Sequence, residues 1–389
     1  MSVASHTEVA SIAPSASSFH PDFLGETARR VGLRRYSGVR QFVVQHLYPD
    51  TLRLLELLHE YLPVDVVIGI SYSGNDDVVQ RLEAMGLRVL TPGYAELQAT
   101  VDRELGRSLA GCRARGEELV IHEVGGYAIK SLHERHADCC ELVAGALEIT
   151  KQGVWVAERL PELRVPQLNC AQTRLKEIEG RMVGESVVTA LDVILRELGY
   201  AVTGRRALVT GYGWVGRGVA VGLKSRGMQV SCFDSDVIKR VEATVDGFEV
   251  PKSPLAALEP AVVVGATGSR SITPELIDRL PHRCCLVSGS SKDHEIDLDY
   301  LRAVTHGSGP VHPHVEALTM EDGRTLYLVN GGYPVNFTGS SVPDEIVEFL
   351  FAELIMLIPE LLEGRPQPGI YPLGRQQEAV AAQIWLDLR

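Results

Sequence analysis

A glycine-rich turn between a strand and a helix constrains this chain more than any other part of its sequence. Residues 207–210 predict the strand, and the turn after it carries Gly211, Gly213 and Gly216 in the spacing G-x-G-x-x-G. The first glycine permits a tight turn, the second lets a phosphate approach the backbone, and the third lets the helix pack against the strand. Because a helix is expected to follow through Lys224, the turn predicts a Rossmann-type dinucleotide-binding unit.

An acidic residue at the end of the next strand indicates which dinucleotide is bound. Residues 229–233 predict this strand, and Asp234 ends it, about 20 residues after the glycines. A carboxylate there accepts hydrogen bonds from the adenosine ribose and repels the additional phosphate of NADP. The helix N-terminus, at Trp214 and Val215, offers backbone N–H groups to the pyrophosphate. We therefore expect NAD as the cofactor, and the alternative is a glycine turn without a ligand.

Strand and helix patterns also alternate before the glycine turn. Short apolar runs suited to buried parallel strands are separated by stretches with leucine at helical spacing. This alternation predicts an α/β domain with a parallel sheet. The expected elements are helices at 51–61, 78–85 and 101–112 and strands at 64–70, 88–90 and 118–122.

The length of the chain indicates two domains, because 389 residues exceed what one core usually supports. An amphipathic helix at 185–200 leads into the nucleotide unit, and an apolar helix at 345–362 can return to the first domain. The predicted fold is two-domain α/β, with a cleft that closes on its ligand. Its parts are a disordered tail at 1–20, a substrate domain with a parallel sheet at 21–183 completed by 339–389, and a Rossmann-type NAD-binding domain at 184–338.

Charge and composition argue against several classes of partner. The formal net charge of −12 disfavours nucleic acid, because phosphate backbones are held by clustered Lys and Arg. No apolar run reaches the length of a membrane span, and residues 1–18 lack a basic start followed by an apolar core, so neither a membrane anchor nor a signal peptide is expected. The 7 cysteines form no CxxC pair, which favours reduced thiols in the cytoplasm.

Several motifs carry a resemblance to a known family. They are Gly184-Glu185-Ser186, GYGWVGRG at 211–218, Asp234-x-Asp236, Thr267-Gly268, Asp293-x-Glu295-Ile296-Asp297 and Val335-Asn336. In this order and spacing the chain resembles the S-adenosyl-L-homocysteine hydrolase family, from about Val43 to Leu357. The resemblance implies a tightly held NAD⁺ that oxidises the 3′-hydroxyl of a nucleoside and so acidifies the 4′ proton. Loss of that proton expels the 5′ thiol, water adds to the alkene, and the ketone is reduced again.

The resemblance also implies which residues contact the nucleoside. His46 matches the active-site histidine, Asp76 matches the aspartate that binds the ribose hydroxyls, and Asp50 lies in the segment that contacts the adenine. From the residues alone, His46 could be structural, and Asp76 or Asp77 could cap a helix that begins near Val78. The further candidates for substrate contact are Tyr48, Asp77, Glu123, Lys176 and Ser291.

Two polar segments allow both a structural and a functional interpretation. Glu123 follows a predicted strand at its carboxyl end, where open parallel sheets collect ligands. With His122 it resembles part of a metal site, but no second histidine or CxxC accompanies it at a suitable spacing, so no metal is expected. Arg174, Lys176 and Glu179 form either a solvated helix face or a group beside the hydride-transfer centre.

Other positions depart from the family in ways that bear on the chemistry. Arg174 stands where the family has its catalytic lysine, and a guanidinium does not release a proton near neutral pH. Further replacements are Ile149, Ile178, Glu179, Val183, Ser291 and, approximately, Val342, whereas Glu148 is retained. Among the cofactor contacts, Thr150 matches the first of three threonines, Lys151 and Gln152 replace the others, and Thr267 and Asn336 are kept.

These matches and departures predict an NAD-dependent enzyme that acts on an adenosine-like nucleoside, with hydroxide as the leaving group and a 4′,5′-alkene as the product. Such a dehydration would be a tailoring step in nucleoside natural-product biosynthesis. His46 is expected to handle the leaving-group proton, Asp76 to hold the diol and Arg174 to stabilise the enolate oxygen. Glu179 and Glu148 are the candidates for the proton-abstracting base.

Two alternatives remain at this point. One is hydrolysis of S-adenosyl-L-homocysteine with a rearranged site, and the other is a non-catalytic NAD-binding regulator. The resemblance also implies a homo-oligomer, a dimer or a tetramer, although the chain ends at Arg389 without the Lys- and Tyr-bearing tail of the family.

Overall fold

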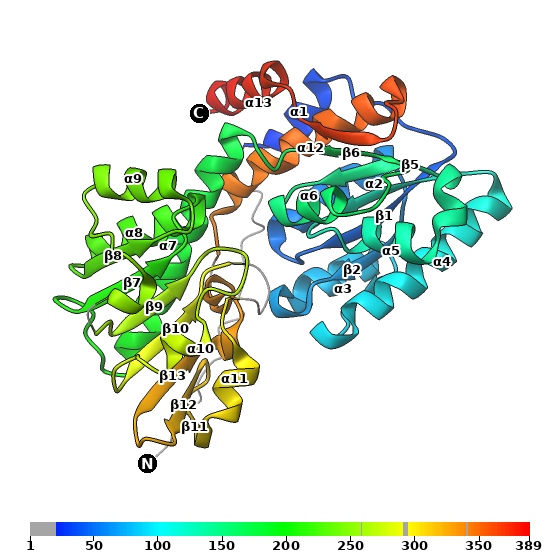
Figure 1. Cartoon of the computed structure of the whole chain (residues 1–389). Coiled ribbons are helices and arrows are strands. Elements are labelled where there is room, and N and C mark those ends of the chain that lie inside the picture. The colour runs from blue at the N-terminus through cyan, green and yellow to red at the C-terminus, as the bar shows by residue number, and fades with distance from the viewer. Residues whose placement is uncertain (1–20, 258, 291–294, 340) are drawn as a thin grey trace, which may run out of the picture.

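The computed structural model describes residues 21–257, 259–290, 295–339 and 341–389, which form two lobes side by side (Figure 1). Each lobe is built on one seven-stranded sheet with helices on its faces. This architecture confirms the predicted α/β fold class. The tail expected at 1–20 and the candidate Ser291 lie outside the described residues.

The sheet of the first lobe is parallel throughout, in the order β14-β6-β5-β4-β1-β2-β3. Its strands are β1 (Val39–Gln45), β2 (Val64–Gly69), β3 (Val89–Leu90), β4 (Glu118–Glu123), β5 (Val143–Glu148), β6 (Pro166–Asn169) and β14 (Gly369–Pro372). The order reverses between β4 and β1, so this lobe has a topological switch point at the carboxyl ends of its central strands.

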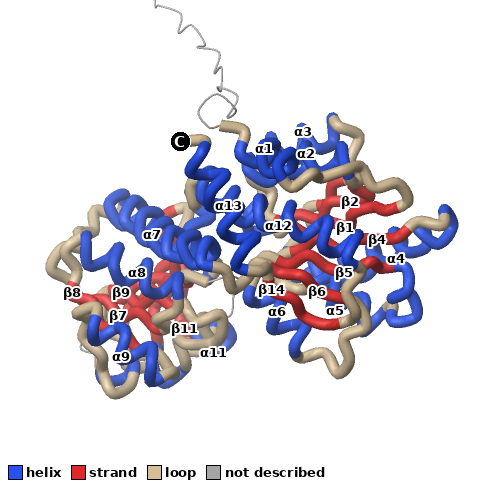
Figure 2. Tube along the Cα trace, turned by 90° about the horizontal axis from the view of Figure 1, so that it is seen from above, coloured by secondary structure: helices blue, strands red, loops and turns tan. Residues whose placement is uncertain are grey.

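Helices from both ends of the chain cover the first sheet. They are α1 (Phe23–Arg30), α2 (Pro49–Tyr61), α3 (Asp76–Ala84), α4 (Leu97–Arg115), α5 (Tyr127–Arg135), α6 (Lys151–Glu158), α12 (Asp344–Gly364) and α13 (Arg375–Asp387). Phe349 of α12 packs edge-to-face on Phe23 of α1 and on Trp385 of α13, with centroids 6.4 and 5.2 Å apart. Figure 2 shows these three helices together, so the first and last described segments share one core.

The second lobe contains the Rossmann unit. Its sheet has the order β11-β12-β13-β10-β9-β7-β8, in which β11 and β12 are antiparallel additions at one edge. The strands are β7 (Arg206–Thr210), β8 (Gln229–Phe233), β9 (Val262–Gly265), β10 (Cys284–Ser288), β11 (Thr305–His312), β12 (Val315–Met320) and β13 (Thr325–Val329). The helices are α7 (Arg174–Glu197), α8 (Trp214–Ser225), α9 (Val237–Val245), α10 (Pro274–Ile277) and α11 (Leu298–Ala303).

Helix α7 begins earlier than the sequence pattern indicated and joins the two lobes. Thr173 caps it by accepting a hydrogen bond from the backbone N–H of Lys176, so the helix starts at Arg174 rather than near residue 185. It packs closely on α8, because a Cβ at Gly184 would lie only 2.5 Å from the backbone nitrogen of Val219. Among the described helices, none is both long and apolar enough to cross a bilayer.

Candidate functional site

The glycine turn of the second lobe has the geometry of a dinucleotide-binding site. Gly211 has φ +96°, a conformation that favours glycine, and a Cβ there would lie 2.5 Å from the carbonyl oxygen of Ala266. A Cβ at Gly216 would overlap the carbonyl oxygen of Gly211. At Gly213, in contrast, a Cβ would meet no atom within 4 Å. The turn is therefore tight where the backbone packs and open where a phosphate would approach.

Two side chains beside the turn also fit NAD. Asp234 lies next to the turn, because its Oδ2 accepts a hydrogen bond of 2.6 Å from the backbone N–H of Tyr212. Asn336 is buried and donates to Ser341, while its Oδ1 has no hydrogen-bond partner in the described part of the chain. A buried amide oxygen without a donor calls for a ligand that supplies one, such as the amide of a nicotinamide ring.

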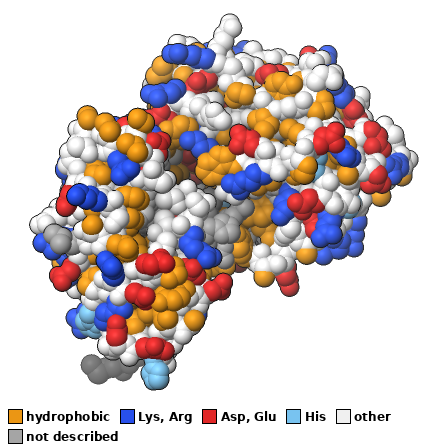
Figure 3. Space-filling model, viewed as in Figure 1, with side chains coloured by type: hydrophobic (Ala, Val, Ile, Leu, Met, Phe, Trp, Pro, Cys, Tyr) orange, Lys and Arg blue, Asp and Glu red, His pale blue; other side chains and the backbone are white. Residues whose placement is uncertain are grey.

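A space between the lobes leads from the turn towards the first sheet. One cavity of 340 Å³ is lined by Lys151, Val154, Trp155, Gln172 and Trp214. A neighbouring cavity of 480 Å³ shares Trp155 and is also lined by Gln152, Glu158, Arg159, Thr267, Gly268, Ser269 and Arg270. Figure 3 shows the face on which the surface is hollowed between the lobes. Helix α6 thus lies opposite the glycine turn, and its N-cap Thr150 accepts from the backbone N–H of Gly153.

His46 follows β1 at the carboxyl edge of the first sheet and is hydrogen-bonded through Nδ1. Its Nδ1 lies 2.5 Å from the hydroxyl of Ser73, which itself donates to the carbonyl of Ile70. With the hydroxyl proton assigned to that bond, Nδ1–H is the donor to Ser73 and Nε2 keeps its lone pair. Burial and the nearby charge of Lys176 lower the pKa of His46 to about 4, so the ring is a neutral proton acceptor at neutral pH.

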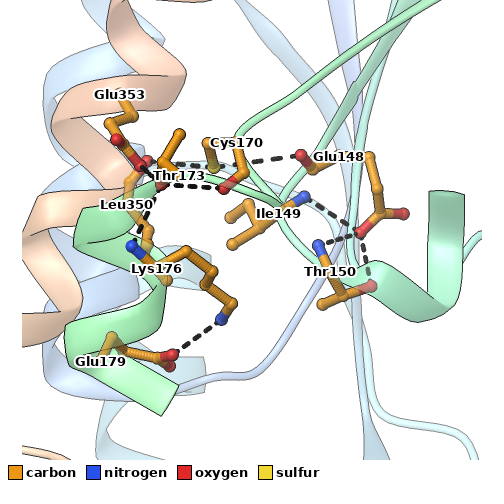
Figure 4. A network of polar contacts seen from close by, with 9 residues as sticks. All are labelled: Glu148, Ile149, Thr150, Cys170, Thr173, Lys176, Glu179, Leu350 and Glu353. Atoms are coloured by element: carbon orange, nitrogen blue, oxygen red, sulfur yellow. Dashed lines mark hydrogen bonds and ion pairs between the residues drawn. The ribbon is translucent and has the colours of Figure 1, made fainter. Parts of the chain in front are cut away.

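Lys176, and not Arg174, brings a positive charge into this region. The Lys176 side chain is 16% exposed and its Nζ lies 2.9 Å from Glu179 Oε2 (Figure 4). Arg174 is 81% exposed and pairs with Glu177, whose side chain is only 12% exposed. Two residues turn a helix by about 200°, so these side chains point in opposite directions. The predicted contact of Arg174 with the enolate oxygen is therefore corrected.

Two buried glutamates have structural roles. Glu148 accepts hydrogen bonds from the backbone N–H groups of Gly125, Gly126, Ile149 and Thr150 and from the Thr150 hydroxyl. Burial raises the pKa of Glu148 to about 7, but its oxygens are occupied by these donors. The prediction that Glu148 serves as the base is therefore not supported.

The Glu123 side chain also accepts hydrogen bonds from backbone N–H groups and does not face the space between the lobes. Its carboxylate accepts hydrogen bonds of 2.6 and 2.9 Å from the backbone N–H groups of Ala128 and Ile129, in the first turn of α5. The interpretation of Glu123 as a substrate contact is corrected by this geometry. The neighbouring His122 is fully buried in β4.

The two predicted aspartates of α3 are exposed. Asn75 caps this helix by accepting from the backbone N–H groups of Asp77 and Val78, so neither Asp76 nor Asp77 is the cap. Asp50, in contrast, is buried at the start of α2. Burial and the charge of Asp344 raise the pKa of Asp50 to about 7, so part of its population carries a proton at neutral pH.

Rings from both lobes gather beside His46, and the sequence patterns did not single out most of them. Phe337 stacks on His46 with centroids 5.1 Å apart and on Tyr48 at 6.0 Å. Tyr72 stacks on Tyr333 at 5.6 Å, and Tyr94 meets Tyr333 edge-on. We call these six residues the aromatic cluster. In the sequence, Tyr72 follows the strand predicted at 64–70 and Phe337 follows the Val335-Asn336 motif, both at loop positions.

Known proteins resemble the chain over both lobes. Residues 183–342 match the family model described as S-adenosyl-L-homocysteine hydrolase, NAD binding domain. A protein named S-inosyl-L-homocysteine hydrolase from Methanopyrus kandleri is 28% identical over 383 residues, which cover 95% of this chain and 88% of the relative. An adenosylhomocysteinase from Thermotoga maritima is 29% identical over 351 residues, which cover 88% of this chain and 85% of the relative.

A third relative matches over a shorter region. It is named S-inosyl-L-homocysteine hydrolase, from Methanothermobacter thermautotrophicus, and is 27% identical over 280 residues. The match covers 70% of this chain and 66% of the relative. The family model falls on the lobe that carries the glycine turn, in agreement with NAD as the cofactor.

Proposed function

We propose that the chain is a divergent member of the S-adenosyl-L-homocysteine hydrolase family and that, with NAD as its cofactor, it eliminates a leaving group from an adenosine-like nucleoside by transient oxidation of a ribose hydroxyl. The chemistry that NAD supplies when bound is reversible hydride transfer at the carbon of that hydroxyl. A ketone at this carbon acidifies the neighbouring C–H group, so a base can remove its proton while the substituent on C5′ departs.

The observation that carries the proposal is the neutral His46 beside the buried pair of Lys176 and Glu179. His46 keeps the Nε2 lone pair and is close enough to Lys176 for that charge to lower its pKa. A neutral imidazole in the low-dielectric space between the lobes can accept a proton and pass it to a departing oxygen. A buried ammonium group can stabilise an oxygen that gains negative charge.

The roles of the predicted residues follow from this arrangement. Lys176 takes over the stabilisation of the enolate oxygen that the sequence had assigned to Arg174. Glu179, held by Lys176, is the proposed base, since Glu148 is occupied by backbone donors. Asp76, exposed at the start of α3, is the proposed ligand of the ribose diol.

We further propose hydroxide as the leaving group. The aromatic cluster encloses His46 with rings on two sides, Phe337 and Tyr72, which favours a small departing group over a long thioether chain. The C–H proton and the C5′ hydroxide leave together as water, and the product is a nucleoside with a 4′,5′ double bond. Since the ketone is reduced again, the net reaction is dehydration without net oxidation.

A second candidate reaction is hydrolysis of a nucleosidyl homocysteine. The names of the relatives favour it, because they are hydrolases of S-inosyl-L-homocysteine or adenosylhomocysteinases. Neutral His46 serves this reaction equally well, since it can activate the water that adds to the alkene.

Mass spectrometry of nucleosides after incubation with NAD-loaded protein separates the two reactions. The substrates are adenosine-type nucleosides with a free 5′-hydroxyl and S-adenosyl- or S-inosyl-L-homocysteine. Loss of one water from the former supports dehydration, whereas release of homocysteine at a comparable or higher rate would show that the enzyme is a hydrolase. A protein that forms no NADH and exchanges no C4′ hydrogen in heavy water with either class is the non-catalytic regulator.

A further inference from the structure

Lys151 reaches from the first lobe to the glycine turn of the second. It is the first residue of α6, and its Nζ lies 3.3 Å from the centroid of the Trp214 ring. Trp214 is the first residue of α8 and directly follows Gly213, the helix N-cap. Both side chains line the cavity of 340 Å³ between the lobes. A cation of the substrate lobe therefore lies beside the turn that approaches the cofactor phosphates.

Lys151 forms no ion pair with the described residues, although the charge of Glu177 acts on it from a longer distance. Lys176 pairs with Glu179 at 2.9 Å and Lys239 pairs with Glu242 at 2.7 Å. No carboxylate of the described chain lies within ion-pair distance of Lys151 itself, which is held over an aromatic face instead. Burial first, and then the charges of Lys239 and Lys176, lower the pKa of Lys151, and the charge of Glu177 offsets this lowering only in part. An anion placed here would therefore stabilise the charged ammonium group.

The anion that fits this position is a pyrophosphate. The N-terminus of α8 offers backbone N–H groups, and the open space over Gly213 lets a phosphate approach them. Lysine suits a phosphate because its ammonium is a compact charge with three rotatable donors. A cation on the facing lobe complements these donors from the other side.

We propose that Lys151 clamps the pyrophosphate of NAD from the substrate lobe, so that both lobes hold the cofactor and its release requires them to separate. Lys151 is then a positioning residue for the cofactor and takes no part in proton transfer. The proposal depends on the NAD site and is independent of which nucleoside reacts.

Titration calorimetry with NAD tests the clamp in the apo protein. K151M is expected to raise the Kd for NAD by about tenfold to a hundredfold, the loss of one charge-assisted hydrogen bond. K151R, which keeps the charge, is expected to stay within a few-fold of the wild type. The matched control is K224M, because Lys224 also lies over a ring, that of Phe248 at 4.8 Å, but at the opposite end of α8.

The dependence of binding on salt distinguishes a phosphate contact from a merely structural contact with Trp214. Loss of a phosphate contact in K151M should flatten the plot of log Kd against log salt concentration. Wild-type affinity in K151M, or weaker binding with an unchanged salt slope, overturns the proposal. Melting curves without NAD verify that each variant folds. A protein that binds NAD in this way but turns over no nucleoside refutes the proposed reaction and leaves the clamp intact.

Discussion

The ring of Phe337 stacks on the ring of His46, with centroids 5.1 Å apart and an angle of 25° between their planes. His46 belongs to the first lobe, whereas Phe337 follows the Rossmann sheet in a short 3-10 helix, Val335–Thr338. The contact therefore joins the lobes at the residue proposed to transfer protons. It also helps to keep that residue out of water.

Removal of the Phe337 ring is expected to raise the pKa of His46 towards its ordinary value, because burial is the main cause of the depression. F337A should also lose roughly 1 kcal/mol of stacking. Titration of the His46 ring by NMR measures the first effect and denaturant unfolding the second. F337L is the control that keeps most of the apolar volume, and an unchanged pKa of His46 in F337A would contradict the enclosing role of the ring.

Substitutions of Lys176 and of Arg174 form a matched pair of variants that tests the proposed role of Lys176. K176M should lower kcat by about a hundredfold or more, because a buried charge that stabilises an oxyanion is lost. R174M should change kcat by less than roughly threefold, since the Arg174 side chain is 81% exposed and points away from Lys176. Steady-state formation of the product, followed by mass spectrometry, gives the two kcat values. Equal losses in both variants would disprove the assignment of Lys176.

The free energy of unfolding should decrease at acidic pH because of His122. This residue is fully buried, neither ring nitrogen has a hydrogen-bond partner among the residues described, and burial lowers its pKa to about 4. Between about pH 6.5 and 4 the unfolded chain binds a proton that the folded chain does not. The free energy of unfolding therefore decreases as the pH falls through this range, by up to about 3 kcal/mol.

H122L should make that decrease shallower and leave the stability at pH 7 close to that of the wild type, since an unpartnered polar ring is replaced by an apolar side chain. Thermal melts across this pH range provide the measurement. H306L, at an exposed position, is the control and should melt as the wild type does. A wild-type pH profile in H122L would rule out His122 as the source.

Glu148 should matter for stability more than for chemistry. E148A leaves several buried backbone N–H groups of the Gly125–Gly126 loop and of Thr150 without their acceptor, at a cost of roughly 3 kcal/mol. Denaturant unfolding measures the loss, with E162A at an exposed position as the control. A complete loss of activity in E148A at wild-type stability would restore Glu148 as a candidate base.

The sequence predicted the Rossmann unit well because local signals there agree with the tertiary structure. Strand β8 begins and ends at the predicted residues, and Gly211 and Gly216 occupy positions where a side chain would collide with backbone. Requirements of this kind depend on the identity of one residue, so they can be recognised from the sequence alone. The antiparallel strands β11 and β12 were missed, since β11 is largely exposed and carries two glycines and a proline.

The part of the site contributed by the first lobe and by α7 was harder to predict for a physical reason. Whether Arg174 or Lys176 faces inwards depends on where α7 begins, and the cap at Thr173 sets that start. The roles of Glu148 and Glu123 depend on backbone N–H groups of the Gly125–Gly126 loop and of the first turn of α5, which donate hydrogen bonds to them. The aromatic cluster forms from segments that only the packing of two lobes brings together.

The return of the C-terminal segment to the first lobe fixes an order of assembly on the ribosome. Strand β14 pairs with β6, and the buried face of α12 packs in the first core, yet both are synthesised after the whole Rossmann sheet. The second lobe is continuous in sequence and can fold as soon as it emerges. The first lobe must wait, with part of its core uncovered, until the last helices leave the exit tunnel.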